Sequence, residues 1–147
     1  MCIDAKIKIE STLENLDAAG LAEGDAERNL IEAGGSYSFS DGEAVICYVE
    51  ENEGGRAESE IILKDGGVTV KRRGAIESEL YFKEGESHSS IYSVPPYKFD
   101  TTVTARRVRV ELNECGGVIT LIYNMKIGGA DKSARMKIWI SQASSQA

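Results

Sequence analysis

The sequence predicts an all-β protein, and more specifically a single antiparallel, up-and-down β-barrel of about eight to ten strands. Apolar and polar residues alternate with a period of two along most of the chain, as they do in half-buried strands. Short glycine-containing turns separate these runs, and no long crossover segment interrupts them. Because a meander leaves two open edges unless it closes, the succession of hairpins favours a barrel over two packed sheets.

Ten alternating runs define the expected strands. Asp-Gly pairs at positions 41–42 and 65–66 suit the positive-φ positions of tight hairpin turns, so the runs beside them should lie antiparallel. A barrel of eight to ten strands has an interior just wide enough for side chains or for one small ligand. The runs lie at residues 3–13, 27–39, 43–50, 57–64, 67–73, 75–83, 87–93, 98–112, 117–127 and 133–141.

Two segments do not follow this pattern. In residues 11–30, leucines at 13, 16 and 21 together with several Ala and Glu residues favour a short helix. Gly20 and Gly24 interrupt that pattern, so we expect instead an exposed loop between two long strands. The polar sequence SQASSQA at 141–147 is expected to form a disordered tail.

Length and composition indicate a single domain over residues 1–147. The chain is 41% hydrophobic and 28% charged, and no apolar run approaches the roughly 20 residues of a membrane-spanning helix. The N-terminal segment alternates lysine with isoleucine and lacks the uninterrupted apolar core of a secretory signal. We therefore expect a cytoplasmic protein that does not bind membranes.

Charge, cysteine and histidine content argue against several classes of function. The net charge of −7 repels a phosphate backbone, so nucleic acid is not an expected partner, although basic clusters occur at 71–73 and 106–109. Three cysteines without a C-x-x-C pair argue against a disulfide framework and a zinc site. A single histidine, His88, argues against a multi-histidine metal site. We expect no metal and no cofactor.

The residues also contain no recognisable catalytic set, so we expect a protein that is not an enzyme. His88 lies among serines and glutamates in EGESHSS, but adjacent strand residues point to opposite faces and no G-x-S-x-G elbow is present. We interpret His88 as a solvent-exposed turn residue. The glycine pairs belong to hairpins and form neither a P-loop nor a dinucleotide fingerprint.

An arginine falls in register with an apolar face in the sequence YKFDTTVTARRVRVEL, residues 97–112. If this is one regular strand, Arg106 lies on the same face as Thr102 and Thr104, and that face ends in apolar residues at 108, 110 and 112. In residues 67–74, the alternation that turns two valines inward also turns Arg72 inward. A buried guanidinium is too costly to remain unpaired, so both arginines need a partner.

Three interpretations of these arginines remain open. In the first they are structural and pair with an internal acid, for which Glu50 is a candidate because it is in phase with Ile46 and Tyr48. In the second they line a pocket for a small anionic or polar molecule, together with Thr102, Thr104, Tyr92 and Tyr123. In the third a β-bulge shifts the register and the arginines lie on the surface.

The order of several stretches resembles the YwiB-like family of small bacterial proteins, a domain of unknown function. These stretches are VTVKRRGAIESELYFKEG at 68–85, YSVPPYKF, GGVITLIYNMKIGG and CYVEENEGG, so the resemblance spans about residues 35–140. It implies a calycin-type barrel, related in architecture to the lipocalins. Calycin barrels often bind small hydrophobic or amphipathic molecules, but a shared architecture does not by itself assign a function.

The resemblance also implies which positions the family pattern marks. An arginine of the pattern falls on Arg72, a tyrosine of the penultimate strand on Tyr123, and an acidic pair on Glu50 and Glu51. The family's threonine falls on Thr102 or Thr104, and Arg106 has no counterpart that can be carried over.

Two functional hypotheses follow. The first is a barrel that holds a small polar or anionic-headed ligand inside. The second is a structural or protein-interaction module with a fully packed interior, which works through an exposed edge or as a homodimer. The candidate ligand-binding residues are Arg72, Arg106, Thr102, Thr104, Tyr92, Tyr123 and Glu50.

Overall fold

Ten β-strands make up the regular structure of the computed structural model, which describes residues 2–17, 19, 21–52, 55–94 and 96–143. Each expected run corresponds to one strand, so the all-β prediction is confirmed. The last strand includes positions 141 and 142 of the expected tail, and residues 144–147 lie outside the described residues. The strands are β1 (Cys2–Leu16), β2 (Ala22–Ser40), β3 (Glu43–Asn52), β4 (Gly55–Lys64), β5 (Gly67–Gly74), β6 (Ser78–Phe82), β7 (Ser87–Val94), β8 (Tyr97–Asn113), β9 (Gly116–Ile127) and β10 (Ala130–Gln142).

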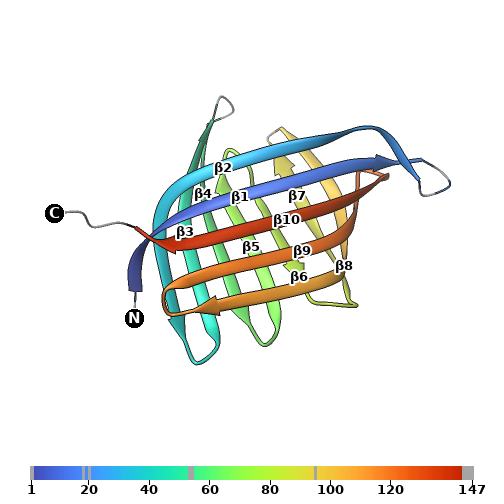
Figure 1. The fold of residues 1–147 in the computed structure, drawn as a ribbon. Coiled ribbons are helices and arrows are strands. Elements are labelled where there is room, and N and C mark those ends of the chain that lie inside the picture. The colour runs from blue at the N-terminus through green and yellow to red at the C-terminus, as the bar shows by residue number, and fades with distance from the viewer. Residues whose placement is uncertain (1, 18, 20, 53–54, 95, 144–147) are drawn as a thin grey trace.

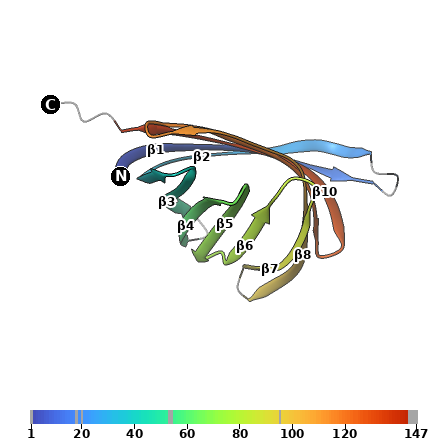
Figure 2. The same cartoon turned by 90° about the horizontal axis from the view of Figure 1, so that it is seen from below.

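The strands form one antiparallel sheet that curls into a nearly closed, up-and-down barrel (Figures 1 and 2). Their order is β6-β5-β4-β3-β2-β1-β10-β9-β8-β7, so sequence neighbours lie side by side and the first strand pairs with the last. An isolated bridge joins the ends of the sheet, where Glu77 and Ser93 exchange two backbone hydrogen bonds of 2.8 Å. Within the described residues, no helix is long and apolar enough to cross a membrane.

Apolar side chains fill the middle of the barrel. A side chain without any accessible surface borders no void large enough for water, so the middle of the barrel is a packed core rather than a ligand cavity. The side chains that are 0% exposed come from strands all round the wall, namely Ile46, Ile61, Val68, Phe82, Ile119, Leu121 and Ile138.

The stretch 11–30 is neither a loop nor a helix, but the far part of two long strands. β1 and β2 stay paired as far as Leu16 and Ala22, and their ribbon extends to one side of the barrel (Figure 1). Asp17 stabilises the turn, because its Oδ1 accepts the backbone N–H groups of Ala19 and Leu21 at 2.9 and 3.0 Å. Most described side chains at the start of β2 are exposed on both faces, so no apolar alternation marks this strand.

A β-bulge in β8 determines which way its side chains face. Ala105 and Arg107 pair with consecutive residues of β9, so Arg106 is an extra residue without a counterpart. Before the bulge the inner face carries positions 101, 103 and 105, and after it the partly buried apolar positions 108, 110 and 112. Arg106 itself is exposed, and its Nη2 donates a hydrogen bond of 3.1 Å to Oγ of Ser133.

The prediction that Arg106 shares an inward face with Thr102 and Thr104 is therefore wrong. Thr102 and Thr104 lie on the outer face, where their hydroxyls are hydrogen-bonded to Ser89 at 3.1 Å and to Ser87 at 2.7 Å. The alternation argument failed here because it assumed a regular strand, whereas the bulge exchanges the two faces within one residue. The third interpretation of the arginines holds for Arg106.

Gly35 lets β2 and β3 approach closely where the wall bends. It pairs with Ala5 on one side and Tyr48 on the other. A Cβ at this position would overlap the Cys47 carbonyl oxygen and touch the side chain of Ile7. The preceding residue, Gly34, has nothing within 4 Å of the corresponding position.

We predict that Gly35→Ala destabilises the protein by about 1–3 kcal/mol, because a methyl group must displace backbone in a packed wall. The matched control, Gly34→Ala, should change the free energy of unfolding by less than about 0.5 kcal/mol. Urea unfolding followed by tryptophan fluorescence measures both. Equal effects of the two substitutions would contradict the close approach at Gly35.

We also predict that deleting Arg106 is tolerated better than deleting Arg109. Without Arg106 the ladder becomes regular and both halves of β8 keep their inner faces, whereas the loss of Arg109 turns Val110 and Leu112 outward. The second deletion should cost at least about 2 kcal/mol more in unfolding free energy, from the apolar area lost. The reverse order in urea unfolding would exclude the bulge at Arg106.

Candidate functional site

A layer of polar side chains lies inside the barrel, toward the end where β3 terminates at Asn52. Residues directly opposite one another in β3, β4, β5 and β6 form inward-facing rows. The apolar row is Ile46, Ile61, Val70 and Leu80. The next row is Tyr48, Ser59, Arg72 and Ser78, and Glu50 lies one row further out.

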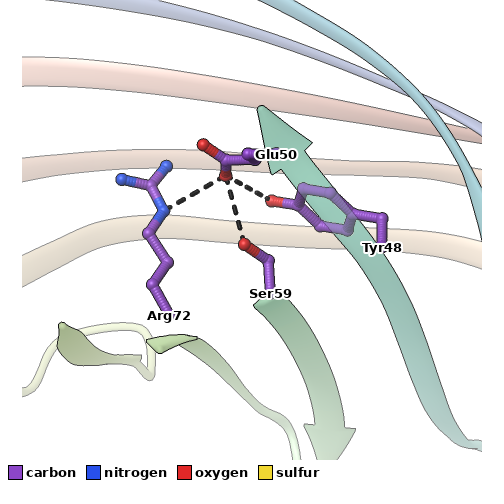
Figure 3. Close-up of polar contacts among 4 residues, drawn as sticks. All are labelled: Tyr48, Glu50, Ser59 and Arg72. Carbon is purple, nitrogen blue, oxygen red and sulfur yellow. Dashed lines mark hydrogen bonds and ion pairs between the residues drawn. The ribbon is translucent and has the colours of Figure 1, made fainter. Parts of the chain in front are cut away.

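The carboxylate of Glu50 is the centre of this layer. Its Oε1 lies 3.3 Å from Arg72 Nε and accepts hydrogen bonds from the Tyr48 hydroxyl at 3.3 Å and the Ser59 hydroxyl at 3.2 Å (Figure 3). The side chains of Glu50 and Arg72 are 7% and 18% exposed. The first interpretation, an internal ion pair between Arg72 and Glu50, is therefore confirmed.

The charges of this cluster stabilise one another against burial. Burial acts to lower the pKa of Arg72, but the Glu50 carboxylate and the nearby Tyr48, Tyr92 and Tyr123 outweigh it, so the pKa is raised. Arg72 is therefore charged across the physiological range. Because the pair carries no net charge, it is less costly to bury than either group alone.

Two tyrosines of the cluster are held neutral. Burial, reinforced by Glu50, raises the pKa of Tyr48 to about 12. Burial also raises the pKa of Tyr123 to about 12, although the charge of Arg72 opposes this shift. Tyr123 also packs edge-on against Phe82, with ring centroids 4.7 Å apart. Both hydroxyls consequently keep their protons and can donate hydrogen bonds at neutral pH.

Several polar atoms of the cluster have no protein partner within the described part of the chain. No hydrogen bond uses the terminal nitrogens of Arg72, the second oxygen of Glu50 or the Tyr123 hydroxyl. Among fully enclosed side-chain N and O atoms, only Arg72 Nε lacks a hydrogen bond, so these other atoms face accessible space. In Figure 3 the terminal nitrogens of Arg72 and the free oxygen of Glu50 point away from the shared contact.

The interior cluster brings together four of the seven predicted site residues. Glu50 and Arg72 are in contact, and the charge of Arg72 acts on both Tyr92 and Tyr123. Tyr92 is half-buried. It lies on the inner face of β7 together with Ser90, and Ser90 pairs with the buried Thr101 of β8. The remaining three residues, Thr102, Thr104 and Arg106, lie on the outer face and are not part of this cluster.

Sequence reasoning missed Ser59, although a signal was present. Ser59 lies between Tyr48 and Arg72 in the same row, since it pairs with both residues across β4. Counting outward from the Asp-Gly turn at 65–66 would have aligned Ser59 with Arg72, because the two residues lie equally far from that turn. The register of neighbouring hairpins, rather than the alternation within one strand, identifies the polar layer.

A groove runs along the same strands. It has a volume of about 1040 Å³ and crosses β2 to β7. Its border includes the outward-facing Cys47, Glu60, Lys71 and Glu79, which form the row next to the inward one. Its charges alternate in sign, and Lys71 and Glu79 form an ion pair of 3.3 Å. Tyr48, Ser59 and Arg72 of the interior cluster also line this groove.

His88, expected in an exposed turn, lies in β7 at the open seam of the barrel. Its Nε2 is 2.9 Å from Glu86 Oε1, and its ring contacts Tyr81 edge-on with centroids 4.7 Å apart. These contacts give His88 a packing role beside the seam. No serine hydroxyl is hydrogen-bonded to His88 among the described residues.

Known proteins match both the sequence and the fold. The family model described as "Domain of unknown function (DUF1934)" matches residues 19–140. The uncharacterized β-barrel protein YwiB of Bacillus subtilis (strain 168) is 24% identical over 121 residues, which cover 81% of this chain and 85% of that protein. The crystal structure of YwiB has a TM-score of 0.83 at 20% identity, covering 97% of this chain and 94% of the other. These matches confirm the barrel fold and the resemblance found in the sequence.

We predict strong energetic coupling between Glu50 and Arg72. Glu50→Gln should destabilise the protein by about 3 kcal/mol, because it leaves a buried guanidinium without its counter-charge. Adding Arg72→Met should recover part of that loss, giving a coupling energy of about 1–3 kcal/mol in a double-mutant cycle measured by urea unfolding.

The exposed pair Lys71 and Glu79 supplies the matched control, since it joins the same two types of charge at the same 3.3 Å distance, with side chains 42% and 62% exposed. Its cycle, with Lys71→Met and Glu79→Gln, should give at most about 0.5 kcal/mol. Additive effects of the Glu50 and Arg72 substitutions would show that their contact does not stabilise the fold.

Proposed function

The chain belongs to the family described as a domain of unknown function, DUF1934, and we propose that it binds a small polar or anionic-headed molecule at the polar end of its barrel. The observation that carries the proposal is the set of unpartnered polar atoms on Arg72, Glu50 and Tyr123. Because these atoms face accessible space, a ligand or water can supply their hydrogen-bond partners.

The chemistry of the cluster limits the class of ligand. The terminal nitrogens of Arg72 present donors in a planar fork that suits a carboxylate or phosphate. The neutral hydroxyl of Tyr123 adds a donor, and the free oxygen of Glu50 adds an acceptor. A ligand that carries an anionic head and a nearby donor therefore matches the cluster better than a purely anionic ligand does.

The packed core limits the size of the ligand. Because the middle of the barrel is filled, the molecule has to lie at the end of the interior, beside the row of Tyr48, Ser59 and Arg72. Long acyl chains do not fit that space. The proposal therefore concerns a compact head group.

Two finer expectations accompany this proposal. A first strand paired with the last in an up-and-down barrel is compatible with a calycin-type, lipocalin-like architecture, in which small molecules bind within the wall. A cytoplasmic location is supported by three cysteines without a C-x-x-C spacing.

The packed core also favours a second candidate function, an interaction module whose interior serves only stability. This second candidate is also compatible with the ion pair between Arg72 and Glu50, because Arg72 already has a partner inside the barrel. The two candidates differ in what the terminal nitrogens of Arg72 do, and one binding experiment separates them.

We predict that acetate and inorganic phosphate, tested against chloride at equal ionic strength, stabilise the protein through Arg72. At saturation either anion should raise the melting temperature by about 5 °C, because a ligand that binds only the folded state stabilises it. Arg72→Lys should remove the effect, since an ammonium cannot reproduce the fork.

Arg106→Lys is the matched control, because Arg106 lies outside the barrel and should leave the anion effect unchanged. NMR chemical shifts of the tyrosine ring signals, followed in the same titration, locate the anion. A wild-type protein that neither acetate nor phosphate stabilises, or an Arg72→Lys variant with an undiminished response, would refute the proposal.

A further inference from the structure

One edge of β2 is left without a neighbouring strand. β2 pairs with β1 along its length, but β3 covers only Gly35–Ser40 on the other side. The backbone groups of residues 22–34 that point away from β1 are therefore not used by the barrel. Within the described part of the chain, β1 and β3 are the strands that make extensive contacts with β2.

This edge is long enough to pair with another chain. The β1–β2 ribbon projects beyond the rest of the barrel (Figures 1 and 2), and residues 26–34 are all exposed or partly exposed. Leu30, midway along residues 26–34, is 52% exposed on the outer face. Exposed edges of this kind are templates for strand addition unless they are covered or charged.

The charges on this edge are suited to a second copy of the same chain. Arg28 and Glu32 flank Leu30 on the outer face, and neither forms an ion pair within the described residues. The two charges are four residues apart along an extended strand, about 13 Å, too far to contact each other. Neither charge is therefore in an ion pair among the described residues, and Lys8 of β1 lies opposite Glu32.

Symmetry restricts how two such edges can pair. A two-fold axis that relates antiparallel strands within one sheet stands perpendicular to the sheet and passes midway between a residue and its own copy on the other strand. An axis at Leu30 places Arg28 opposite Glu32 of the second copy, and it does so twice. An axis at Arg28 or Glu32 sets like charges opposite each other, and an axis at Asn29 or Ile31 sets Arg28 opposite an uncharged residue.

We propose that two copies of this chain form a dimer by joining their β2 edges antiparallel, with Leu30 opposite Leu30 and two Arg28–Glu32 pairs across the two-fold axis. Residues 26–34 of each copy add a continuous ladder, which merges the two barrels into one extended sheet. The leucine pair removes exposed apolar surface, and the two charge pairs fix the register. The interior cluster at Glu50 and Arg72 takes no part in this interface.

Sedimentation equilibrium of the full chain over a range of concentrations tests the dimer. The wild-type protein should associate reversibly to twice the monomer mass. Arg28→Glu and Glu32→Arg should each raise the dissociation constant about tenfold or more, because each places two like-charge pairs opposite each other. The double variant Arg28→Glu/Glu32→Arg should restore association, because both pairs are re-formed with reversed polarity.

A matched control is Glu111→Arg, which reverses an exposed charge on β8 and should leave the dissociation constant unchanged. Circular dichroism of each variant checks that the barrel is folded. A wild-type protein that stays monomeric at every concentration would overturn the proposal, and so would a dimer that both single reversals leave intact. A double variant as weak as the single ones would exclude this register.

Discussion

The antiparallel pairing of β1 with β10 is the constraint on which the rest of the barrel depends. It extends from Ala5–Gln142 to Asn15–Lys132 and joins the two ends of the meander. Without it, β1 to β6 and β7 to β10 would form two separate sheets that meet only at the isolated bridge. The contact is highly non-local, so the barrel closes only when the first and last strands meet. On the outer face, Lys8 and Lys137 lie over the Trp139 ring at 5.3 and 5.2 Å from its centroid.

The sequence was sufficient for the strands because most of them have one buried and one exposed face. Buried residues at every second position, separated by Asp-Gly or Gly-Gly turns, specify both the strand and its orientation. The same rule fails for the β1–β2 ribbon, because a strand that is exposed on both faces needs no alternation of apolar and polar residues. Leu, Ala and Glu in that segment satisfy helix propensity equally well, and only the pairing with β1 decides the outcome.

Arg72 and Arg106 gave the same signal in the sequence, yet only Arg72 points inward. β5 is eight residues long and is fixed at its start by the positive-φ turn of Asp65 and Gly66, so its alternation cannot slip. β8 has 17 residues, and it absorbs one extra residue at Arg106. A bulge is a local backbone feature with no obligatory residue type, so alternation alone could not place it. Strand length is the physical difference, since a long strand around a curved wall has more room for a register shift.

The direction of the Arg72 guanidinium bears on whether the buried pair serves stability alone. Replacing a buried ion pair by apolar residues of similar volume is often neutral or stabilising, so stability by itself does not explain why a charged pair lies here. A pair built for stability alone would be expected to join both terminal nitrogens to both carboxylate oxygens. Here Glu50 uses Oε1 for all three contacts, and Arg72 offers only Nε to it. The terminal nitrogens of Arg72 and one oxygen of Glu50 thus remain turned toward accessible space, while two hydroxyls hold Glu50 in place, which leaves these groups available to the small ligand that we propose.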